Sequence, residues 1–567
     1  MSVIIDKFQA IVKAHGSRVA LAYLQDDKYH HLDYNALDNY RLQIANWWSK
    51  LGFTKGQKVA VMLPNSPEWV ISDLASATLG LTMVPLHATY NATQLKRIID
   101  HAQIDYLVVY QEYFDQHKDL FLNHSFKKRI IVGLVEEKDV DYWPVLKYKN
   151  DLSKINVPIK EDDLHTIIYT SGTTGDPKGV MLSHKNIVAD VEAAKRSVKI
   201  TELDKFFSFL PLSHAFERTA GYYAAIFSGS SIYFAQSSKT IIEDIKKAKP
   251  TILPSVPRIF EKVYDKIFDK VVSGNKLKKK MFYHLLNLAR SAKKNNLKFV
   301  EKIQLSLLDK IIFNKIRAIL GGHLRMAISG GASLNPNIAK FFENLGIQII
   351  EGYGLTETSP IVAVNQLDNY KFGTVGKALD CNKVKIAENK EIIVSGDNVM
   401  MGYYDNPEAT KEVIKDGWFY TGDLGFIDED GFLTIIGRAK DIIVLSTGKN
   451  IFPEPIENAL NESKYINQSF VYGDNDKNLS VLIVPDFEEL AIWSRKNDVD
   501  FSLPDALKNS KVLILYKKKI DKWLKGFSEI EKVQNFILVS EEFSQENGLL
   551  TPTLKLRRKM IKGKFDL

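Results

Sequence analysis

The sequence predicts an α/β protein: a large, multi-subdomain N-terminal region with parallel-type sheets flanked by helices, a small β-rich subdomain, and a small α/β C-terminal domain. Three observations predict this class. The chain has 567 residues, and this number is larger than a single hydrophobic core can accommodate. Residues 1–160 alternate helical periodicity with short runs of β-branched residues, which is typical of a parallel sheet covered by helices. From about residue 371 the pattern changes to short strands and turns.

The predicted elements of the N-terminal region follow one another in chain order. We expect helices at 37–51, 67–79, 92–101 and 186–198. We expect buried strands at 58–63, 83–86, 106–109, 129–132, 206–210, 231–234, 251–253, 324–328 and 347–350. Several of these strands end in small or polar residues. Ligands of α/β sheets bind at the carboxyl ends of strands, so we expect these ends to face one cleft.

The remaining segments set the predicted domain boundaries. Short strands are expected at 391–394, 417–423, 432–436, 468–472 and 480–484, and a helix at 505–523. These patterns predict an N-terminal domain over 1–437 and a C-terminal domain over 438–567. Within the first, we expect a basic helical insertion at about 261–320 and the β-rich subdomain at about 371–437.

Composition and charge exclude several classes of protein. The single cysteine, Cys381, rules out an intramolecular disulfide framework and a multi-cysteine zinc site. No uncharged apolar run reaches the length of a membrane span, and the N-terminus lacks the apolar core of a signal peptide. We therefore expect a cytoplasmic protein, at most peripheral to the inner face of a membrane, that does not bind nucleic acid.

The excess of positive charge is concentrated in one segment. The net charge is +8, and residues 262–302 carry twelve Lys and Arg against Asp265, Asp269 and Glu301. Two interpretations fit: a solvated helical face, which is the usual role of such a segment, or a contact with acidic lipid headgroups.

The run Tyr169-Thr170-Ser171-Gly172-Thr173-Thr174-Gly175-Asp176-Pro177-Lys178-Gly179 has the composition of a phosphate-binding loop. Glycines allow close approach of the backbone to a ligand, and backbone N–H groups and hydroxyls donate to one anion. Lys178 adds a positive charge. The run does not match the P-loop pattern, because Gly175 is followed by Asp-Pro-Lys. A polar turn between a strand and a helix is the alternative, and the lysine after Gly-Asp-Pro favours phosphate binding.

Four motifs in a fixed order identify a family. They are the loop at 169–179, Glu351-Gly352-Tyr353-Gly354-Leu355-Thr356-Glu357, Tyr420-Thr421-Gly422-Asp423 and Gly437-Arg438-Ala439-Lys440-Asp441. With them the chain resembles the AMP-forming, adenylating superfamily of acyl-CoA synthetases, luciferases and peptide-synthetase adenylation domains. The segments 210–218, 254–262 and 548–558 are most similar to those of long-chain fatty acid–CoA ligases. One departure is Leu554, where many relatives have glycine.

The resemblance implies ATP-dependent activation of a long-chain fatty acid to acyl-AMP with release of pyrophosphate, then transfer to CoA. Mg²⁺, a hard cation suited to oxygen ligands, is implied at Thr170 and Glu357. Tyr353 is implied to stack on adenine and Asp423 to accept from the ribose hydroxyls. The implied nucleotide-binding residues are Thr170, Ser171, Gly172, Thr173, Thr174, Gly175, Lys178, Gly331, Ala332, Gly352, Tyr353, Gly354, Thr356, Asp423 and Arg438.

The resemblance also implies the catalytic residues Lys555, His214, Glu357 and Thr170. Lys555 is implied to stabilise charge at the α-phosphate, and His214 to border the acyl carboxylate. Lys440 matches the family's hinge, about which a mobile C-terminal domain rotates between the two half-reactions. Two alternatives remain. One is a ligase that passes the acyl chain to a carrier protein, and the other is a catalytically silent acyl- or nucleotide-binding module.

Overall fold

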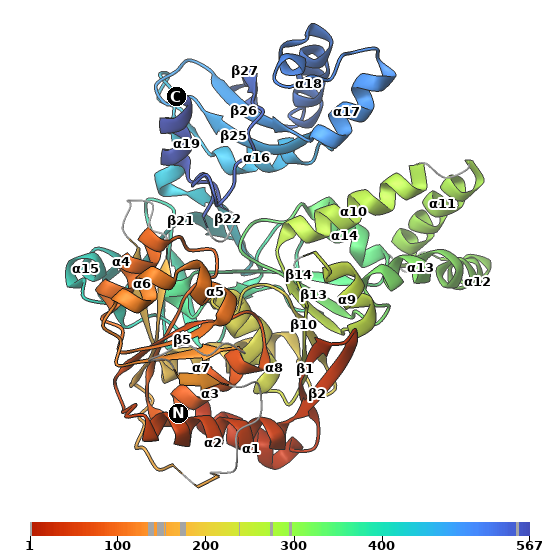
Figure 1. Ribbon diagram of the computed structural model, residues 1–567. Coiled ribbons are helices and arrows are strands. Elements are labelled where there is room, and N and C mark those ends of the chain that lie inside the picture. The colour runs from red at the N-terminus through yellow and green to blue at the C-terminus, as the bar shows by residue number, and fades with distance from the viewer. Residues whose placement is uncertain are drawn as a thin grey trace. The chain divides into compact units, whose positions relative to one another are not determined.

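The structure is a computed structural model that describes residues 3–133, 141–143, 152–153, 155–170, 177–237, 239–272, 276–293, 297–551 and 555–567 (Figure 1). Contacts divide the chain into two compact units. The first comprises Met1–Lys385, Ile393–Tyr420 and Asp428–Leu433, and the second comprises Ile386–Ile392, Thr421–Ile427 and Thr434–Leu567. The predicted domain boundary after residue 437 stays a prediction.

Two large sheets, mostly parallel, form the first unit. The nine-stranded sheet has the order β16 (Lys377–Ala378), β15 (Ile361–Val364), β14 (Gln348–Gly354), β13 (Met326–Ser329), β12 (Ile252–Ser255), β10 (Lys205–Ser208), β11 (Ser231–Phe234), β1 (Val19–Gln25) and β2 (Lys28–Asp33). The eight-stranded sheet has the order β19 (Gly402–Tyr403), β9 (Lys178–Ser183), β8 (Leu164–Thr170), β4 (Thr82–Pro85), β3 (Lys58–Met62), β5 (Tyr106–Tyr110), β6 (Lys128–Val132) and β7 (Asp141–Trp143). The predicted α/β class is confirmed.

Helices and short helical turns connect these strands. They are α1 (Ile4–His15), α2 (Tyr34–Lys50), α3 (Pro67–Leu79), α4 (Ala92–Ala102), α5 (Gln111–Gln116), α6 (Lys118–Asn123), α7 (His184–Val198), α8 (Ala224–Ile226), α9 (Ile241–Ala248), α10 (Pro257–Val272), α11 (Lys276–Lys293), α12 (Phe299–Leu308), α13 (Asn314–Arg317), α14 (Pro336–Asn344) and α15 (Pro407–Val413). The π-helical turns are η1 (Glu217–Tyr223) and η2 (Asp309–Phe313), and the 3₁₀ turns are η3 (Ala318–Leu320) and η4 (Thr356–Thr358). Helices α10 to α13 project from one side of the unit (Figure 1).

Helix α3 shows how local sequence and packing agree. Ser66 caps its N-terminus by accepting from the Trp69 N–H, Pro67 occupies the first turn, and Gly80 ends the helix with a φ of +65°. Every residue of the helix is buried. A helix buried on all sides must satisfy its polar side chains internally, and the Ser72 hydroxyl accordingly donates to the carbonyl four residues earlier at 2.7 Å. The predicted bounds of this helix are confirmed.

Both faces of the nine-stranded sheet are covered. Alternate residues along a strand point to opposite faces, so Phe206 of β10 and Ile252 of β12 join one core cluster, whereas Phe207 and Leu253 join another. The second cluster lies between the sheet and α9, α10, α11 and α14. This arrangement explains why the strands are continuous apolar runs rather than alternating ones.

The phosphate-loop segment does not lead directly into a helix. Residues 178–183, which follow the loop, form β9, and β9 pairs antiparallel with β8. Helix α7 begins only at His184, after Ser183 caps it by accepting from the Asn186 N–H at 3.1 Å. The segment therefore connects two antiparallel strands, and the predicted helix at 186–198 begins two residues earlier than expected.

Two other predicted elements also differ in extent. The strand predicted at 347–350 continues to Gly354 as β14, because its last three residues pair antiparallel with β15. The helix predicted at 505–523 is a 3₁₀ turn at Asp505–Lys508 followed by α18 (Ser510–Trp523), because Asn509 caps the new helix by accepting from the Lys511 N–H.

The remaining strands and helices belong mainly to the second unit. A sheet with the order β17 (Asn382–Ile386), β18 (Glu391–Gly396), β21 (Trp418–Ile427) and β20 (Ile414–Lys415), with β22 (Leu433–Arg438) beside β21, confirms the β-rich segment. A three-stranded sheet follows, of β25 (Ile466–Tyr472), β26 (Leu479–Pro485) and β27 (Val533–Leu538). The other elements are η5 (Ala439–Asp441), β23 (Ile443–Val444), β24 (Asn450–Ile451), α16 (Pro453–Asn461), α17 (Phe487–Lys496), η6 (Asp505–Lys508), η7 (Glu529–Glu531) and α19 (Arg558–Phe565).

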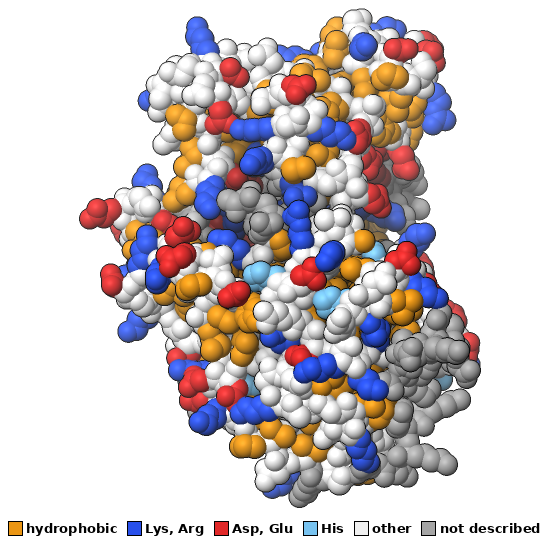
Figure 2. All heavy atoms as spheres, turned by 60° about the vertical axis from the view of Figure 1, so that its left-hand side comes forward, with side chains coloured by type: hydrophobic (Ala, Val, Ile, Leu, Met, Phe, Trp, Pro, Cys, Tyr) orange, Lys and Arg blue, Asp and Glu red, His pale blue; other side chains and the backbone are white. Residues whose placement is uncertain are grey.

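The surface carries charges of both signs. On the face drawn in Figure 2, Lys and Arg side chains are interspersed with Asp and Glu, and apolar side chains occur in small groups. Among the helices that the structure describes, none combines the length and the apolar character that a membrane crossing requires.

Candidate functional site

The ends of β8 and β9 hold the two flanks of the predicted phosphate loop. Thr170 and Lys178 are cross-strand partners, and the Thr170 hydroxyl oxygen lies 3.5 Å from the Lys178 carbonyl oxygen. Residues 171–176, which include Ser171, Gly172, Thr173, Thr174 and Gly175, lie outside the described residues. The hairpin therefore fixes the positions from which the loop begins and to which it returns.

A tyrosine joins Lys178 to Glu357. The Lys178 ammonium lies 4.8 Å from the centre of the Tyr403 ring, and the Tyr403 hydroxyl donates to Glu357 Oε1 at 2.9 Å. Tyr403 reaches this place because β19 pairs with β9, which puts Tyr403 opposite Val180. The structure thus brings together two of the predicted site residues, and it adds Tyr403, which sequence reasoning missed.

Three predicted strand ends lie side by side. Strands β12, β13 and β14 are parallel neighbours, and Ser255 and Ser329, the last residues of β12 and β13, stand in one register with Glu351 of β14. The predicted residues Gly331 and Ala332 follow β13 after Gly330 and are exposed. Gly331 has a φ of +84°, and a side-chain carbon placed on it meets no atom within 4 Å. Its backbone is therefore open to a ligand from that side.

The second motif runs along the end of β14. Tyr353 pairs with Ala363 of β15 and is half-buried, with Gly352 and Gly354 on either side. A side-chain carbon on Gly354 lies 1.7 Å from the Pro360 carbonyl oxygen, so only glycine fits there. Thr356 and Glu357 follow in η4 and are half-buried. The motif therefore holds Tyr353 on a rigid strand with little side-chain bulk beside it.

Glu351, at the start of this motif, is a buried carboxyl group. Its exposed fraction is 7%, and its Oε2 accepts from the Leu334 N–H at 3.2 Å. Burial raises the pKa of Glu351 to about 7, while the Leu334 and Gly373 N–H groups partly offset this rise. The group therefore changes its charge near neutral pH.

Glu351→Gln should flatten the pH dependence of stability. Because the folded pKa, about 7, lies above the ordinary value of 4.5, the folded protein binds more protons than the unfolded chain between these values. The free energy of unfolding should fall as pH rises through this window, by up to about 3 kcal/mol from this group. The amide keeps the hydrogen-bond acceptor but does not ionise. Urea denaturation at pH 5 and pH 8 checks this, with the exposed Glu112→Gln of α5 as control. An unchanged pH dependence in Glu351→Gln would contradict the assignment.

His214 lies in the loop after β10, in a network of local bonds. Its N–H donates to the Pro211 carbonyl at 2.9 Å, and its Nδ1 accepts from the Phe216 N–H at 3.3 Å. Its ring lies 6.4 Å from that of His87, which follows β4. His87 Nδ1 is 2.7 Å from the Ser213 hydroxyl, and burial lowers the pKa of His87 to about 3. His87 is therefore neutral near pH 7.

Asn65, after β3, also clamps this loop. Its amide donates to the Ser208 hydroxyl at 3.0 Å and to the Leu210 carbonyl at 2.6 Å, and its carbonyl accepts from the Leu212 N–H at 3.0 Å. The eight-stranded sheet therefore holds the loop that carries His214. His87 and Asn65 were missed by sequence reasoning, although each is a polar residue at the end of a buried strand, the same signal that marked other candidates.

A buried ionic cluster holds η1, the helical turn that follows the His214 loop. Arg218 of η1 forms an ion pair with Asp73 of α3 and donates to the Thr166 hydroxyl at 2.7 Å. Asp73 also accepts from the Tyr222 and Tyr223 hydroxyls at 3.0 and 2.7 Å. Burial opposes the charged form of Asp73, but Arg218 and the hydrogen bonds to the carboxylate hold its pKa below the usual value. The cluster fixes η1, which follows the His214 loop.

The predicted ribose-binding residues form a pair in the second unit. Asp423 of β21 is 5% exposed, and Arg438 of β22 forms an ion pair with it at 2.9 Å. The Asp423 backbone N–H donates to the Thr421 hydroxyl, which in turn donates to the Ile392 carbonyl. The carboxylate is therefore held by its backbone, as a fixed acceptor requires.

Lys440 and Lys555 are both exposed residues of the second unit. Lys440 lies in η5, directly after Arg438 and Ala439. The Lys555 N–H donates to the Thr551 hydroxyl at 3.0 Å, and the Lys555 carbonyl accepts from the Thr551 N–H at 2.8 Å. Arg558, three residues later, pairs with Glu457 of α16 and lies 3.7 Å from Asp441.

The donor set fits Mg²⁺ shared with a nucleotide. Mg²⁺ is commonly held by one or two carboxylates together with substrate phosphates, and it keeps several waters. Glu357 supplies a carboxylate and Thr170 a hydroxyl, whereas the described residues contain no group of three or more His, Cys, Asp or Glu suited to a metal ion. Glu357 and Thr170 therefore fit an Mg²⁺ ion that also binds substrate phosphates.

Comparison with known proteins gives the family. A family model described as AMP-binding enzyme matches residues 8–404, and one described as AMP-binding enzyme C-terminal domain matches residues 440–504. The chain belongs to the AMP-binding enzyme family.

Within that family, it belongs to the branch of the long-chain fatty acid–CoA ligases. It is 32% identical over 531 residues to "Long-chain-fatty-acid--CoA ligase FadD15" of Mycobacterium bovis, covering 91% of this chain and 88% of the relative. It is 35% identical over 546 residues to "Long-chain-fatty-acid--CoA ligase 5" of Rattus norvegicus, covering 89% of this chain and 78% of the relative.

Solved structures agree in fold. The adenylation domain of a carboxylic acid reductase from Segniliparus rugosus, in complex with AMP and a co-purified carboxylic acid, superposes with a TM-score of 0.78 at 21% identity, covering 100% of this chain and 93% of that one. O-succinylbenzoate CoA synthetase from Bacillus subtilis, in complex with AMP, gives a TM-score of 0.71 at 19% identity, covering 98% and 97%.

Proposed function

We propose that the protein activates a long-chain fatty acid with ATP to form acyl-AMP and pyrophosphate, and then transfers the acyl group to CoA with release of AMP. The observation that carries this proposal is the 32% identity to a long-chain-fatty-acid–CoA ligase along 91% of the chain. A carboxylate is a poor acyl donor because its leaving group is oxide. Attack on the α-phosphorus of ATP makes AMP the leaving group for the CoA thiol.

The residues of the first unit hold ATP and its Mg²⁺ in this proposal. The loop from Thr170 to Gly175 and Lys178 bind the phosphates, while Tyr353 stacks on adenine beside Gly331 and Ala332. Glu357 and Thr170 help to place the metal, which neutralises charge on the phosphates when it is bound. The Tyr403 hydroxyl, which donates to Glu357, holds the carboxylate in one orientation.

The residues of the second unit act on the ribose and at the reacting centre. Asp423 accepts from the ribose hydroxyls and Arg438, its ion-pair partner, assists at the ribose or a phosphate. Lys555 stabilises charge at the α-phosphate during adenylation. His214, of the first unit, borders the acyl carboxylate. Because transfer of this kind depends on positioning and charge, no covalent enzyme intermediate is needed.

The experiment that tests the proposal is a panel of carboxylates of graded length, assayed for AMP release with ATP, with and without CoA. A ligase of this class releases AMP only with a long-chain acid and makes acyl-CoA. Acyl-AMP that accumulates with CoA present and is consumed only by a carrier protein would instead assign the carrier-loading reaction. Absence of any acid-dependent AMP release would assign a silent binding module.

Lys440→Pro should slow thioester formation more than adenylation. In the proposed cycle the C-terminal domain, 438–567, rotates at Lys440 after adenylation and removes Lys555 from the reacting centre. Proline fixes φ and removes the N–H, so it restricts the backbone change at this residue. The two half-reactions are measured separately, as pyrophosphate release and as acyl-CoA formed from supplied acyl-AMP. Equal losses in both would argue against hinge control.

We also propose a cytoplasmic location with peripheral contact between the basic segment 262–302 and the acidic inner face of a membrane. This rests on the excess of Lys and Arg in that segment. A fatty acid is an amphiphile that partitions into bilayers, so such a contact brings the enzyme to its substrate.

A further inference from the structure

Helix α12 exposes a stripe of large apolar side chains. No residue of the helix is buried. The exposed apolar residues of α12 and the adjoining turn η2 are Phe299 (78%), Val300 (63%), Ile303 (47%), Leu307 (58%) and Ile311 (54%). Four of them are spaced by four residues, from 299 to 311, so they share one side of the helical segment. We call this surface the apolar stripe.

A different side of the same segment holds it in place. Leu305, Leu308 and Ile312 are partly buried and pack against the core cluster that lies behind the nine-stranded sheet. The helix is thus apolar on two sides, one of which anchors it to the unit while the other is exposed. A contiguous exposed apolar surface of this kind marks an interaction site rather than ordinary surface.

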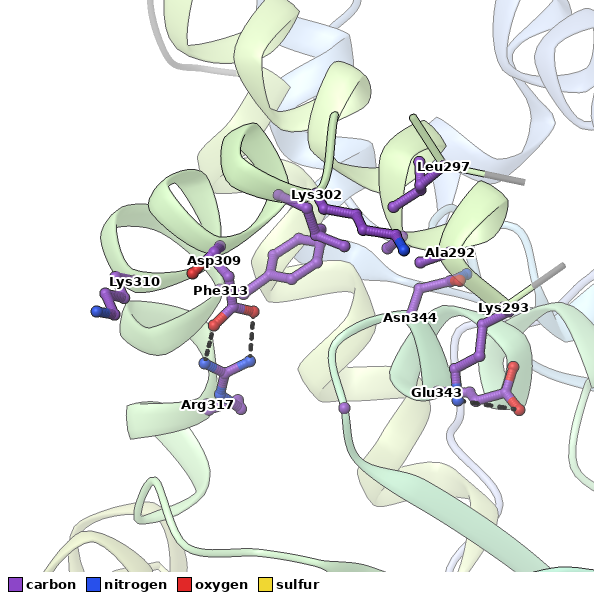
Figure 3. A pocket seen from close by; sticks show the side chains of 14 residues that line it. Ala292, Lys293, Leu297, Lys302, Asp309, Lys310, Phe313, Arg317, Glu343 and Asn344 are labelled. Carbon is purple, nitrogen blue, oxygen red and sulfur yellow. Dashed lines mark hydrogen bonds and ion pairs between the residues drawn. The ribbon is translucent and has the colours of Figure 1, made fainter. Parts of the chain in front are cut away.

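Lysines border the apolar stripe. Lys298 directly precedes α12, and Lys302 and Lys310 are exposed residues that also line a pocket of about 560 Å³. Figure 3 shows Lys302 extending across this pocket towards Ala292 and Leu297, and Lys310 at its outer edge.

The other cations of the pocket are already paired. Lys293 lies 3.7 Å from Glu343, and Arg317 forms a bidentate ion pair with Asp309 (Figure 3). Among the described residues, no carboxylate lies within ion-pair distance of Lys302 or Lys310. An apolar surface with such a border fits a partner that is apolar inside and negative outside.

We propose that α12 and η2 dock on an anionic lipid bilayer, with the apolar stripe entering the boundary between headgroups and acyl chains and the bordering lysines meeting lipid phosphates. This deepens the peripheral contact proposed above and names its residues, half of which lie beyond the basic segment. An amphipathic helix in this position lies in the plane of the interface and enters it by about 5–10 Å. The ten residues of α12 are too few to span a bilayer, which takes about 20.

The test measures binding of the full chain to vesicles by flotation. Vesicles of phosphatidylcholine alone are compared with vesicles that also contain phosphatidylglycerol, and the wild type should bind only the latter strongly. The variant Ile303→Gln/Leu307→Gln removes two side chains of the apolar stripe and should lower the partition coefficient at least about ten-fold. Lys302→Gln and Lys310→Gln should each lower it about five-fold.

Matched controls test whether vesicle binding depends on this surface or on exposed apolar side chains in general. Ile514→Gln replaces an apolar residue of α18 that is 56% exposed, and it should bind as the wild type does. All variants should keep the wild-type rate of acyl-CoA synthesis with dissolved fatty acid, because the substituted residues lie outside the proposed catalytic site. If the wild type and all variants make no acyl-CoA from dissolved fatty acid, this result contradicts the proposed reaction and not the docking surface.

Three outcomes would overturn the inference. If the stripe variant binds like the wild type and only salt weakens binding, the contact is electrostatic, and the proposed peripheral contact survives without the inserted stripe. If the wild type does not bind anionic vesicles, both fail. If the stripe variant instead abolishes a concentration-dependent dimer while vesicles are not bound, the surface is an interface between copies of the chain.

Discussion

Lys555→Ala should lower fatty-acid-dependent pyrophosphate release by about 100- to 1,000-fold, the usual cost of removing one preorganised group that stabilises charge in a transition state. The reaction of supplied acyl-AMP with CoA should be nearly unchanged. In the proposed cycle Lys555 acts only while negative charge develops at the α-phosphate, and it has left the reacting centre before the thiol attacks.

From the structure we expect Lys555→Ala to change the reaction rate without changing the fold. The backbone of Lys555 is held by its two bonds to Thr551, and its neighbour Leu556 is held by the bridge to Leu550. The side chain is exposed, so its removal creates no cavity. Folding should therefore be unaffected, and the loss should appear in the rate alone.

Both half-reactions are needed to check this prediction. Pyrophosphate release is measured with fatty acid and ATP, and acyl-CoA formation is measured with chemically prepared acyl-AMP. Lys559→Ala, an exposed lysine of α19 four residues later, is the matched control for loss of positive charge and should keep both rates. If supplied acyl-AMP also fails to react with Lys555→Ala, the assigned role is wrong.

Local sequence patterns predicted the elements that depend on neighbours along the chain. The cap at Ser66, the proline at 67 and the left-handed Gly80 define α3 without reference to the rest of the molecule. The buried strands β3 and β11 likewise appear as short runs of apolar residues. For such elements, hydrophobic periodicity and capping carry the information.

Long-range pairing explains what the sequence did not predict. Tyr403 enters the candidate site because β19 pairs with β9, more than two hundred residues earlier in the chain. The continuation of β14 through Tyr353 depends in the same way on β15. The second apolar side of α12 has helical periodicity like that of a core face, so only the structure distinguishes the side that packs from the side that is exposed.

Arg218→Met should destabilise the first unit by about 3–5 kcal/mol, because it leaves the Asp73 carboxylate buried without its cation. Asp73 is fully buried, and its remaining partners are the Tyr222 and Tyr223 hydroxyls and His165, whose Nε2 lies 3.3 Å from Asp73 Oδ1. Burial lowers the pKa of His165, so this ring is neutral near pH 7 and does not replace the positive charge of Arg218. The double variant Arg218→Met/Asp73→Leu should recover part of this loss, since a well-packed apolar pair replaces a buried ion pair at little cost.

The chain offers a matched pair of the same chemistry at the surface. Arg196 donates to both oxygens of Asp380 at 2.9 and 2.8 Å, but their side chains are 57% and 59% exposed. Arg196→Met should therefore cost no more than about 1 kcal/mol. Denaturation in urea, followed by tryptophan fluorescence, measures both variants, and Trp69 lies 5.4 Å from the Arg218 guanidinium as a local reporter.

The comparison decides whether burial or hydrogen-bond geometry sets the strength of these ion pairs. Equal losses for Arg218→Met and Arg196→Met would show that the buried cluster is not what fixes η1. A large loss at Arg218 alone would show that the cluster holds η1, and with it the loop that carries His214, against α3. Because η1 directly follows the loop that carries His214, a destabilised η1 should reduce adenylation as well as stability.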